Sequence, residues 1–213
     1  MTRESLDYWR DAGASKTFTH PLVPERLDSL DRSARILDYG CGYGRVMAEL
    51  SDLGFTGVQG VDPSAALVSR GRGRRPDLSF TVLDTPPSTP FPEARFEAVL
   101  LFAVLTCVPD GDAQAAVMAE VARVLKPGGL LYVSDMPLQD DERNRERYDA
   151  HAERHGGPYG VFTTGDGATF RHHGPDELRG LLADFDILEE HRLAVPTING
   201  NRSEAVQILA RRA

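Results

Sequence analysis

The sequence predicts an α/β fold in which a parallel, doubly wound sheet is covered by helices on both faces. Two observations support this prediction. Between residues 35 and 134, five apolar strand-like runs alternate with helical segments, a pattern typical of parallel sheets. Two more strand candidates, 186–195 and 205–211, follow near the C-terminus. We therefore expect a seven-stranded sheet in a single domain that spans residues 1–213.

The first five strand candidates are short, largely apolar runs followed by polar or turn-forming residues. They are Arg35–Asp38, Val58–Asp62, Ser79–Leu83, Ala98–Phe102 and Leu130–Ser134. Helices are expected over 43–53, 64–72 and 113–125. The third helix has apolar residues near helical spacing and stops at Lys126-Pro127-Gly128-Gly129, since proline and glycine end helices.

Two segments lie outside this alternating pattern. Residues 1–34 precede the first strand, and we expect them to form a lid, with a helix that enters the core after Pro24. Residues 137–174 are an insertion after the fifth strand. The other expected elements are helices at 4–12, 140–155 and 176–183 and hairpin strands at 161–164 and 168–172.

Composition and charge limit the partners and the compartment. The formal charge of −8 disfavours a surface that follows nucleic-acid phosphates. The two cysteines, Cys41 and Cys107, indicate a reducing cytoplasm and support neither a disulfide framework nor a metal site. No apolar run approaches the roughly 18 residues of a membrane span. We therefore expect a cytoplasmic monomer or homodimer without a metal and with no nucleic-acid or membrane partner.

The most informative motif joins the first strand to the helix that follows. Gly40, Gly42 and Gly44 allow a tight turn and a close approach of the backbone to a ligand. The spacing differs from that of a dinucleotide site, because the third glycine comes one residue early and Arg45 stands where that motif has glycine. Asp38 ends the strand, where its carboxylate suits an ammonium group better than a pyrophosphate. The turn therefore favours a cationic or zwitterionic nucleoside over NAD.

Acidic residues also end the next two strands. Asp62 follows Asp38 by 24 residues and can accept both hydroxyl groups of a ribose. Asp84 ends the third strand, where it either accepts an exocyclic amine such as that of adenine or caps a turn. Because the carboxyl ends of parallel strands meet at one edge of a sheet, the three acids together predict a nucleoside site.

These residues resemble the class I S-adenosylmethionine-dependent methyltransferases over about residues 33–135 and the final strand pair. The motifs are Leu37-Asp38-Tyr39-Gly40-Cys41-Gly42-Tyr43-Gly44, Gly60-Val61-Asp62-Pro63-Ser64, Asp84 and Val124-Leu125-Lys126-Pro127-Gly128-Gly129-Leu130. The resemblance implies a Rossmann-like sheet whose last strand is antiparallel. It also implies S-adenosylmethionine as the cofactor and S-adenosylhomocysteine as the product.

The resemblance further implies which residues bind the cofactor. Asp38 and the glycine backbone are expected at the methionine end, Asp62 at the ribose and Asp84 with Thr85 at the adenine. The full set is Asp38, Tyr39, Gly40, Cys41, Gly42, Asp62, Pro63, Asp84, Thr85 and Phe102. The acid–His pair that many relatives carry after the fourth strand is missing, and so is the Asp/Asn-Pro-Pro-aromatic signature of amino-directed base methyltransferases.

An acceptor hydroxyl or carbon acid needs a general base, and three residues are candidates. His20 lies just ahead of the core and is either this base or a packed loop histidine. His172 and His173 follow the hairpin and face opposite ways, so at most one reaches the site, and we assign His173. Asp135 ends the fifth strand and either faces the acceptor or caps a turn.

The sequence thus predicts a methyltransferase that acts on a small-molecule acceptor by in-line displacement at oxygen, nitrogen or carbon. Residues 1–24 and 137–174 are expected to build the acceptor pocket. Two alternatives stay open: a peptide or protein methyltransferase, which needs an open groove, and a non-catalytic protein that binds the cofactor. The acceptor is not predicted, because variable segments build its pocket.

Overall fold

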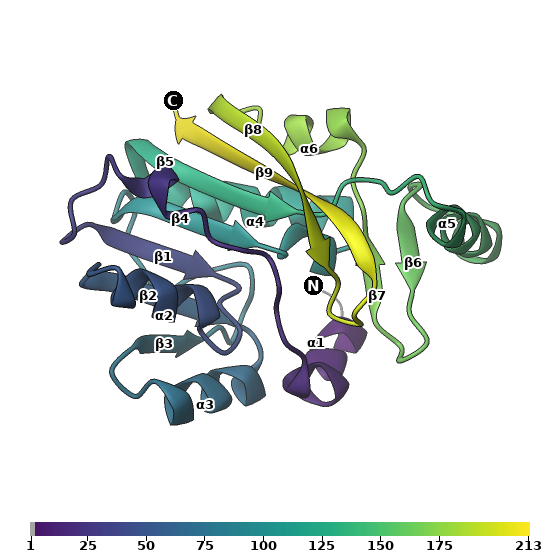
Figure 1. Cartoon of the computed structure of the whole chain (residues 1–213), viewed down its shortest axis with the longest axis horizontal. Helices are drawn as coiled ribbons and strands as arrows, with labels where there is room; N and C mark the ends of the chain where they lie inside the picture. Colours follow the sequence, from purple (N-terminus) through teal and green to yellow (C-terminus); the bar gives the residue numbers. More distant parts are fainter. Residues whose placement is uncertain (1–2) are drawn as a thin grey trace.

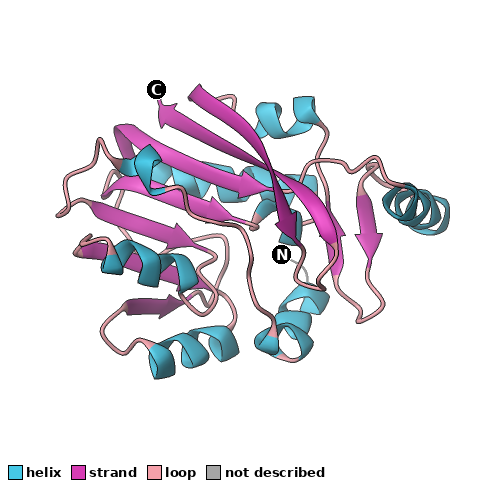
Figure 2. Cartoon of the chain, viewed as in Figure 1, coloured by secondary structure: helices cyan, strands magenta, loops and turns pink. Residues whose placement is uncertain are grey.

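The computed structural model describes residues 3–213 and contains one seven-stranded sheet (Figures 1 and 2). Its strands are β1 (Arg35–Tyr39), β2 (Gly57–Asp62), β3 (Ser79–Val82), β4 (Phe96–Phe102), β5 (Leu125–Asp135), β8 (Phe185–Pro196) and β9 (Arg202–Arg212). They lie in the order β3-β2-β1-β4-β5-β9-β8, and β9 runs antiparallel to both of its neighbours. The predicted sheet with an antiparallel last strand is confirmed.

Four of the six α-helices within residues 3–213 cover the two faces of this sheet, and the first and fifth lie outside it. The helices are α1 (Arg3–Arg10), α2 (Arg45–Asp52), α3 (Ala65–Arg74), α4 (Gly111–Val124), α5 (Glu142–His155) and α6 (Pro175–Leu181). Successive strand residues point to opposite faces, so Leu37 and Leu101 pack with α4 and α6, while Ile36 and Leu100 pack with α2 and α3. Strands buried on both faces explain the continuous apolar runs in the sequence.

Two predicted elements differ in the structure. The helix expected after Pro24 is only a 3₁₀ turn over Pro24–Leu27, although Leu27 is fully buried as expected. The chain turns soon afterwards, where the Asp31 carboxylate accepts hydrogen bonds from the backbone N–H and the hydroxyl of Ser33. Also, β5 begins at Leu125, so the Lys-Pro-Gly-Gly run is an irregularity within this strand rather than a turn before it.

The insertion and the N-terminal segment share a small aromatic core outside the sheet. As predicted, the insertion holds helix α5 and a hairpin of β6 (Val161–Thr163) and β7 (Thr169–Arg171). Tyr8 and Trp9 of α1 pack in one cluster with Phe170 of this hairpin. In Figure 1 both segments lie beyond the carboxyl ends of the central strands. No helix within residues 3–213 is long and apolar enough to cross a membrane.

Candidate functional site

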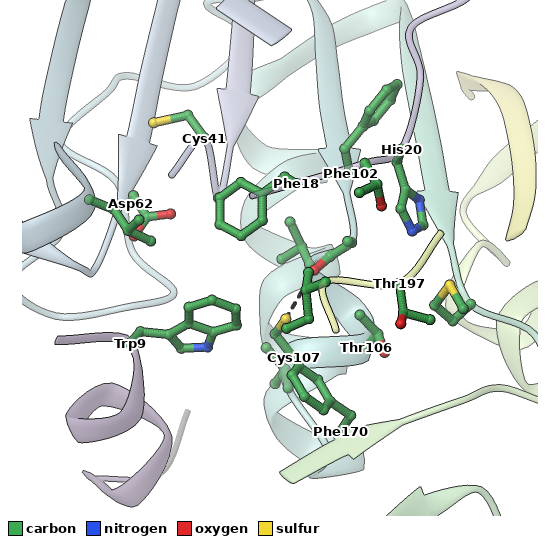
Figure 3. Close-up of a pocket in the computed structure, with 18 of the residues that line it drawn as sticks. Trp9, Phe18, His20, Cys41, Asp62, Phe102, Thr106, Cys107, Phe170 and Thr197 are labelled. Carbon is green, nitrogen blue, oxygen red and sulfur yellow. Dashed lines mark hydrogen bonds between the residues drawn. The ribbon is translucent and has the colours of Figure 1, made fainter. Parts of the chain in front are cut away.

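A cavity of about 170 Å³ opens at the carboxyl ends of β1, β2 and β4. The loops after these strands line one side. The chain ahead of β1, the insertion hairpin, α5 and the loop between β8 and β9 line the other side. In Figure 3, Asp62 lies on one side of the cavity and His20 and Thr197 on the other, with Phe18 between them. The site therefore sits where strand order reverses in the sheet, between β1 and β4.

The glycine turn lies beside this cavity, and its residues Gly40 and Cys41 line it. Gly40, Gly42 and Gly44 have φ angles of 77°, 54° and 78°, a region that favours glycine. A Cβ atom at Gly40 would lie 2.6 Å from Val104, and one at Gly42 would lie 2.2 Å from Phe18. The turn therefore requires glycine both for its backbone conformation and for the close approach of its neighbours.

Asp38 and Asp62 are buried in the cavity wall but are held differently. The Asp62 carboxylate accepts hydrogen bonds from the backbone N–H groups of Gly42 at 2.8 Å and of Ser64 at 2.7 Å. Burial raises the pKa of Asp62 to about 6, and these bonds oppose the rise. Within residues 3–213, no hydrogen bond reaches the Asp38 carboxylate. Burial raises the pKa of Asp38 to about 7, although Arg45 opposes the shift.

The remaining predicted cofactor residues divide into two groups. Tyr39, Gly40, Cys41, Pro63 and Phe102 line the cavity, whereas Gly42 contributes its N–H to Asp62. Asp84 and Thr85 are exposed and lie outside the lining. The two prolines that follow them, Pro86 and Pro87, line the cavity instead, and the Tyr39 hydroxyl donates a hydrogen bond to the Pro87 carbonyl at 2.8 Å.

His20 is a buried residue of the lining. Its Nδ1 atom lies 2.8 Å from Oγ of Ser134 at the end of β5. The Gln207 amide donates to the same hydroxyl at 3.3 Å and to the Pro21 carbonyl at 2.7 Å, so the ring is fixed against the sheet. Burial and the nearby Arg45 charge lower the pKa of His20 to about 4. The imidazole is therefore neutral near pH 7.

His173 and Asp135 lie behind the cavity wall and outside its lining. The Asp135 carboxylate accepts hydrogen bonds from the backbone of Thr106 and Met136, which makes it a turn cap. His173 is fully buried, with Nε2 2.8 Å from the Gln114 amide. Its neighbour His172 lines the cavity instead. One of the two adjacent histidines thus faces the site, as the alternation along a strand predicts.

Three segments close the cavity through polar contacts. Lys16 forms an ion pair with Asp166 of the hairpin at 2.7 Å and donates a hydrogen bond to Asn199 of the β8–β9 loop at 2.6 Å. The Tyr8 hydroxyl also donates to Asp166, at 3.1 Å. The Thr19 hydroxyl donates to the Pro196 carbonyl at 2.5 Å. Sequence reasoning assigned residues 1–24 and 137–174 to the acceptor pocket but not the β8–β9 loop, since these contacts depend on the folded arrangement of distant loops.

The chain matches a family model described as a methyltransferase domain over residues 8–184. Two curated relatives are similar to it. Methyltransferase-like protein 27 of Homo sapiens is 35% identical over 134 residues, which cover 62% of this chain and 53% of that protein. Sterol 4-C-methyltransferase strm-1 of Caenorhabditis elegans is 32% identical over 136 residues, with coverages of 61% and 39%. The matches thus span about half or less of these relatives.

A solved structure is similar over nearly the whole fold. It is a crystal structure of an S-adenosylmethionine-dependent methyltransferase from Methanosarcina mazei, with 26% sequence identity and a TM-score of 0.82. The similarity covers 90% of this chain and 98% of that one.

Proposed function

Since the chain belongs to the S-adenosylmethionine-dependent methyltransferase family, we propose that it transfers the methyl group of this cofactor to a small organic acceptor. One observation carries the proposal. The acidic residues suited to the donor and the aromatic and histidine side chains of the added segments line a single cavity. A donor and an acceptor can therefore meet in one enclosed space.

The residues of the cavity fit the donor. Asp38 offers a buried carboxylate, free of hydrogen bonds from residues 3–213, to an ammonium or sulfonium group, and Gly40 and Cys41 of the adjacent turn line the same space. Asp62 is held in place by two backbone N–H groups and lines the same space, which suits the two hydroxyls of a ribose. When bound, S-adenosylmethionine supplies a methyl group that is activated by a positively charged sulfur.

In-line methyl transfer needs alignment more than covalent help. Holding two reactants in an aligned geometry is worth on the order of 7–11 kcal/mol of the barrier. Trp9 and Phe18 provide rigid walls for this alignment, because their rings pack edge-on at 5.9 Å and both line the cavity. The contacts of Lys16 with Asp166 and Asn199 join the N-terminal segment, the hairpin and the β8–β9 loop beside the cavity.

His20 is the residue we assign as general base. It lines the cavity and is neutral near pH 7. It accepts a proton of the acceptor at Nε2 in the tautomer whose Nδ1–H donates to the Ser134 hydroxyl. A positioned base typically adds about 10²–10⁴-fold to the rate. A base in the lining favours a catalytic protein over a non-catalytic binding protein.

The contacts between the segments that flank the cavity favour a small acceptor over a peptide. A peptide substrate requires an open groove, whereas contacts among residues 16–19, 166 and 196–199 cross this cavity. The proposed acceptor is therefore a compact molecule that enters when these segments separate.

Isothermal titration with S-adenosylhomocysteine tests the donor site. The wild-type chain should bind it, and Asp62→Ala should weaken binding about 100-fold or more, because a buried acceptor of hydrogen bonds is lost. Asp52→Ala is the matched control, since the Asp52 side chain is 71% exposed and pairs with Arg75 at the surface. No binding by the wild type, or equal binding by both variants, would contradict the proposal.

Asp62 also holds the glycine turn, so Asp38→Asn serves as a second variant that removes charge without removing a hydrogen-bond acceptor from Gly42.

Incubating the protein with a metabolite extract and radiolabelled cofactor then tests transfer. Label in a small organic product supports the proposal, whereas label found only in proteins would favour the peptide alternative.

A further inference from the structure

Two arginines of the insertion lie at the opposite end of the cavity from the acids. Arg143 and Arg147 are four residues apart on α5, so they share one face of the helix, and both line the cavity. The acidic residues of the lining, Asp38 and Asp62, follow β1 and β2. Figure 1 shows α5 on the far side of the molecule from these strands. Both carboxylates of the lining therefore lie at one end of the cavity, with Arg45, which pairs with Glu49, and the other end holds two arginines and, among residues 3–213, no carboxylate of the lining.

The charge of Arg147 is only partly balanced. The side chain is half-buried, its guanidinium carbon lies 3.4 Å from the centre of the Phe162 ring, and its buried Nε atom has no hydrogen-bond partner. Within residues 3–213 it forms no ion pair. Burial lowers the pKa of Arg147 and the charge of Arg143 lowers it further, whereas the neighbouring Tyr148 and Asp141 oppose the shift. A half-buried guanidinium that has no carboxylate partner carries a free-energy cost that an anion would reduce.

Arg143 stands at the rim of the same end. Its side chain is 42% exposed, and its Nε atom is 3.8 Å from Asp141, a long contact. The Asp141 carboxylate already accepts hydrogen bonds from the backbone and the side chain of Asn144 at the start of α5. By contrast, Arg145 on the same helix pairs with Asp140 at 2.6 Å.

His172 adds a donor to this end. Tyr148 accepts a hydrogen bond from the Gln139 backbone at 3.3 Å, and its own hydroxyl lies 2.6 Å from Nδ1 of His172. Because the buried hydroxyl hydrogen needs an acceptor, it goes to Nδ1, and Nε2 of the imidazole then carries the hydrogen. Phe162 and Phe170 make the adjoining wall apolar.

We propose that this end of the cavity binds an acidic group, a carboxylate or a phosphate, of an otherwise apolar acceptor, and that Arg147 with Arg143 holds it. The proposal rests on the proposed function and specifies its substrate class. A guanidinium presents a planar fork of donors that matches either anion. The apolar walls suit the hydrocarbon part of an aromatic or aliphatic acid.

Isothermal titration of acids and their uncharged amides tests this substrate class, with the protein saturated by S-adenosylhomocysteine. The probes are phenylacetate, indole-3-acetate and octanoate, each measured against its uncharged amide, together with phenyl phosphate. We expect at least one acid to bind about 10- to 100-fold more tightly than its amide, the range expected for a charged hydrogen bond. A phosphate preference would appear as tighter binding of phenyl phosphate than of phenylacetate.

Arg147→Gln should abolish the acid-over-amide ratio, Arg147→Lys should retain part of it, and the matched control Arg145→Gln should leave it unchanged. The ratio is taken within each variant, so a general loss of folded protein cancels. Equal binding of every acid and its amide, or an undiminished ratio in Arg147→Gln, would overturn the proposal. Weaker S-adenosylhomocysteine binding in Arg147→Gln would also overturn it, because the arginine would then belong to the donor site. Failure of the wild type to bind S-adenosylhomocysteine would instead reject the proposed function.

Discussion

The Nδ1 atom of His20 lies 2.8 Å from the Ser134 hydroxyl, so a residue ahead of the sheet is tied to the carboxyl end of β5. This contact orients the ring that we assign as general base. His20→Gln should lower kcat about 10²–10⁴-fold while leaving the Kd for S-adenosylhomocysteine nearly unchanged. His191→Gln is the control, since the His191 side chain is 58% exposed on β8. An unaltered kcat in His20→Gln would remove this residue from the mechanism.

The pH profile gives a second measurement of the same residue. Burial lowers the pKa of His20 to about 4, so the neutral, proton-accepting form persists as the pH falls well below 6.5, the usual value. We expect the acidic fall in kcat that belongs to His20 to be centred near pH 4. A fall centred near pH 6.5 in the wild type would show that another group is the base.

Donor binding should depend on the ionisation of Asp38. Burial raises the pKa of this carboxyl to about 7 in the free protein, and a cationic ligand binds its ionised form. S-adenosylmethionine affinity should therefore increase as the pH rises through 7, with protons released on binding. Titration in two buffers of different ionisation enthalpy measures this release. In Asp38→Asn, both the proton release near pH 7 and the pH dependence should be reduced; an unchanged release would assign it to another group.

The glycine turn offers a matched pair of substitutions. Gly42→Ala and Gly54→Ala both place alanine at a positive φ, which typically costs about 1 kcal/mol or more. Only at Gly42 would the new Cβ meet a side chain, Phe18 at 2.2 Å, whereas nothing lies within 4 Å at Gly54. Gly42→Ala should therefore lower the free energy of unfolding by more and also weaken donor binding. Denaturant unfolding compares the two variants. Equal losses in the free energy of unfolding would show that the Phe18 side chain moves aside without destabilising the protein.

The ion pair between Lys16 and Asp166 should matter for acceptor binding more than for stability. Both side chains are partly exposed, so the pair contributes about 1 kcal/mol or less to the free energy of unfolding. Asp166→Asn should raise the KM for the acceptor several-fold, because it weakens the closure of the cavity. Asp140→Asn removes a surface ion pair with Arg145 and serves as the control. Equal KM values for the two variants would show that the contact between Lys16 and Asp166 does not affect acceptor binding.

The sequence was sufficient to predict the sheet and to bring Asp38 and Asp62 to one edge of it, where both line the cavity. Local patterns determine apolar strands buried on both faces, and Asp38 and Asp62 lie where such strands end. The choice between His172 and His173 depends on how the hairpin docks, which no local pattern determines. The sequence did not predict the position of Arg147 for a similar reason. A charged helix face normally lies in solvent, and the tertiary structure places this one against the cavity. Asp84 is exposed because the chain reaches the cavity two residues later, at Pro86 and Pro87.

The carboxylates at one end of the cavity and the arginines at the other favour one orientation of a bound acceptor. An amphipathic acid that enters is aligned head to tail, since Arg147 attracts its anionic group and Asp38 repels it. The anionic group is then used for binding and is not itself methylated. The distance in the site between Arg147 and the sulfonium then determines which atom of the acceptor is methylated. Two acceptors with different nucleophilic atoms but the same reach would be modified at the same position along their length.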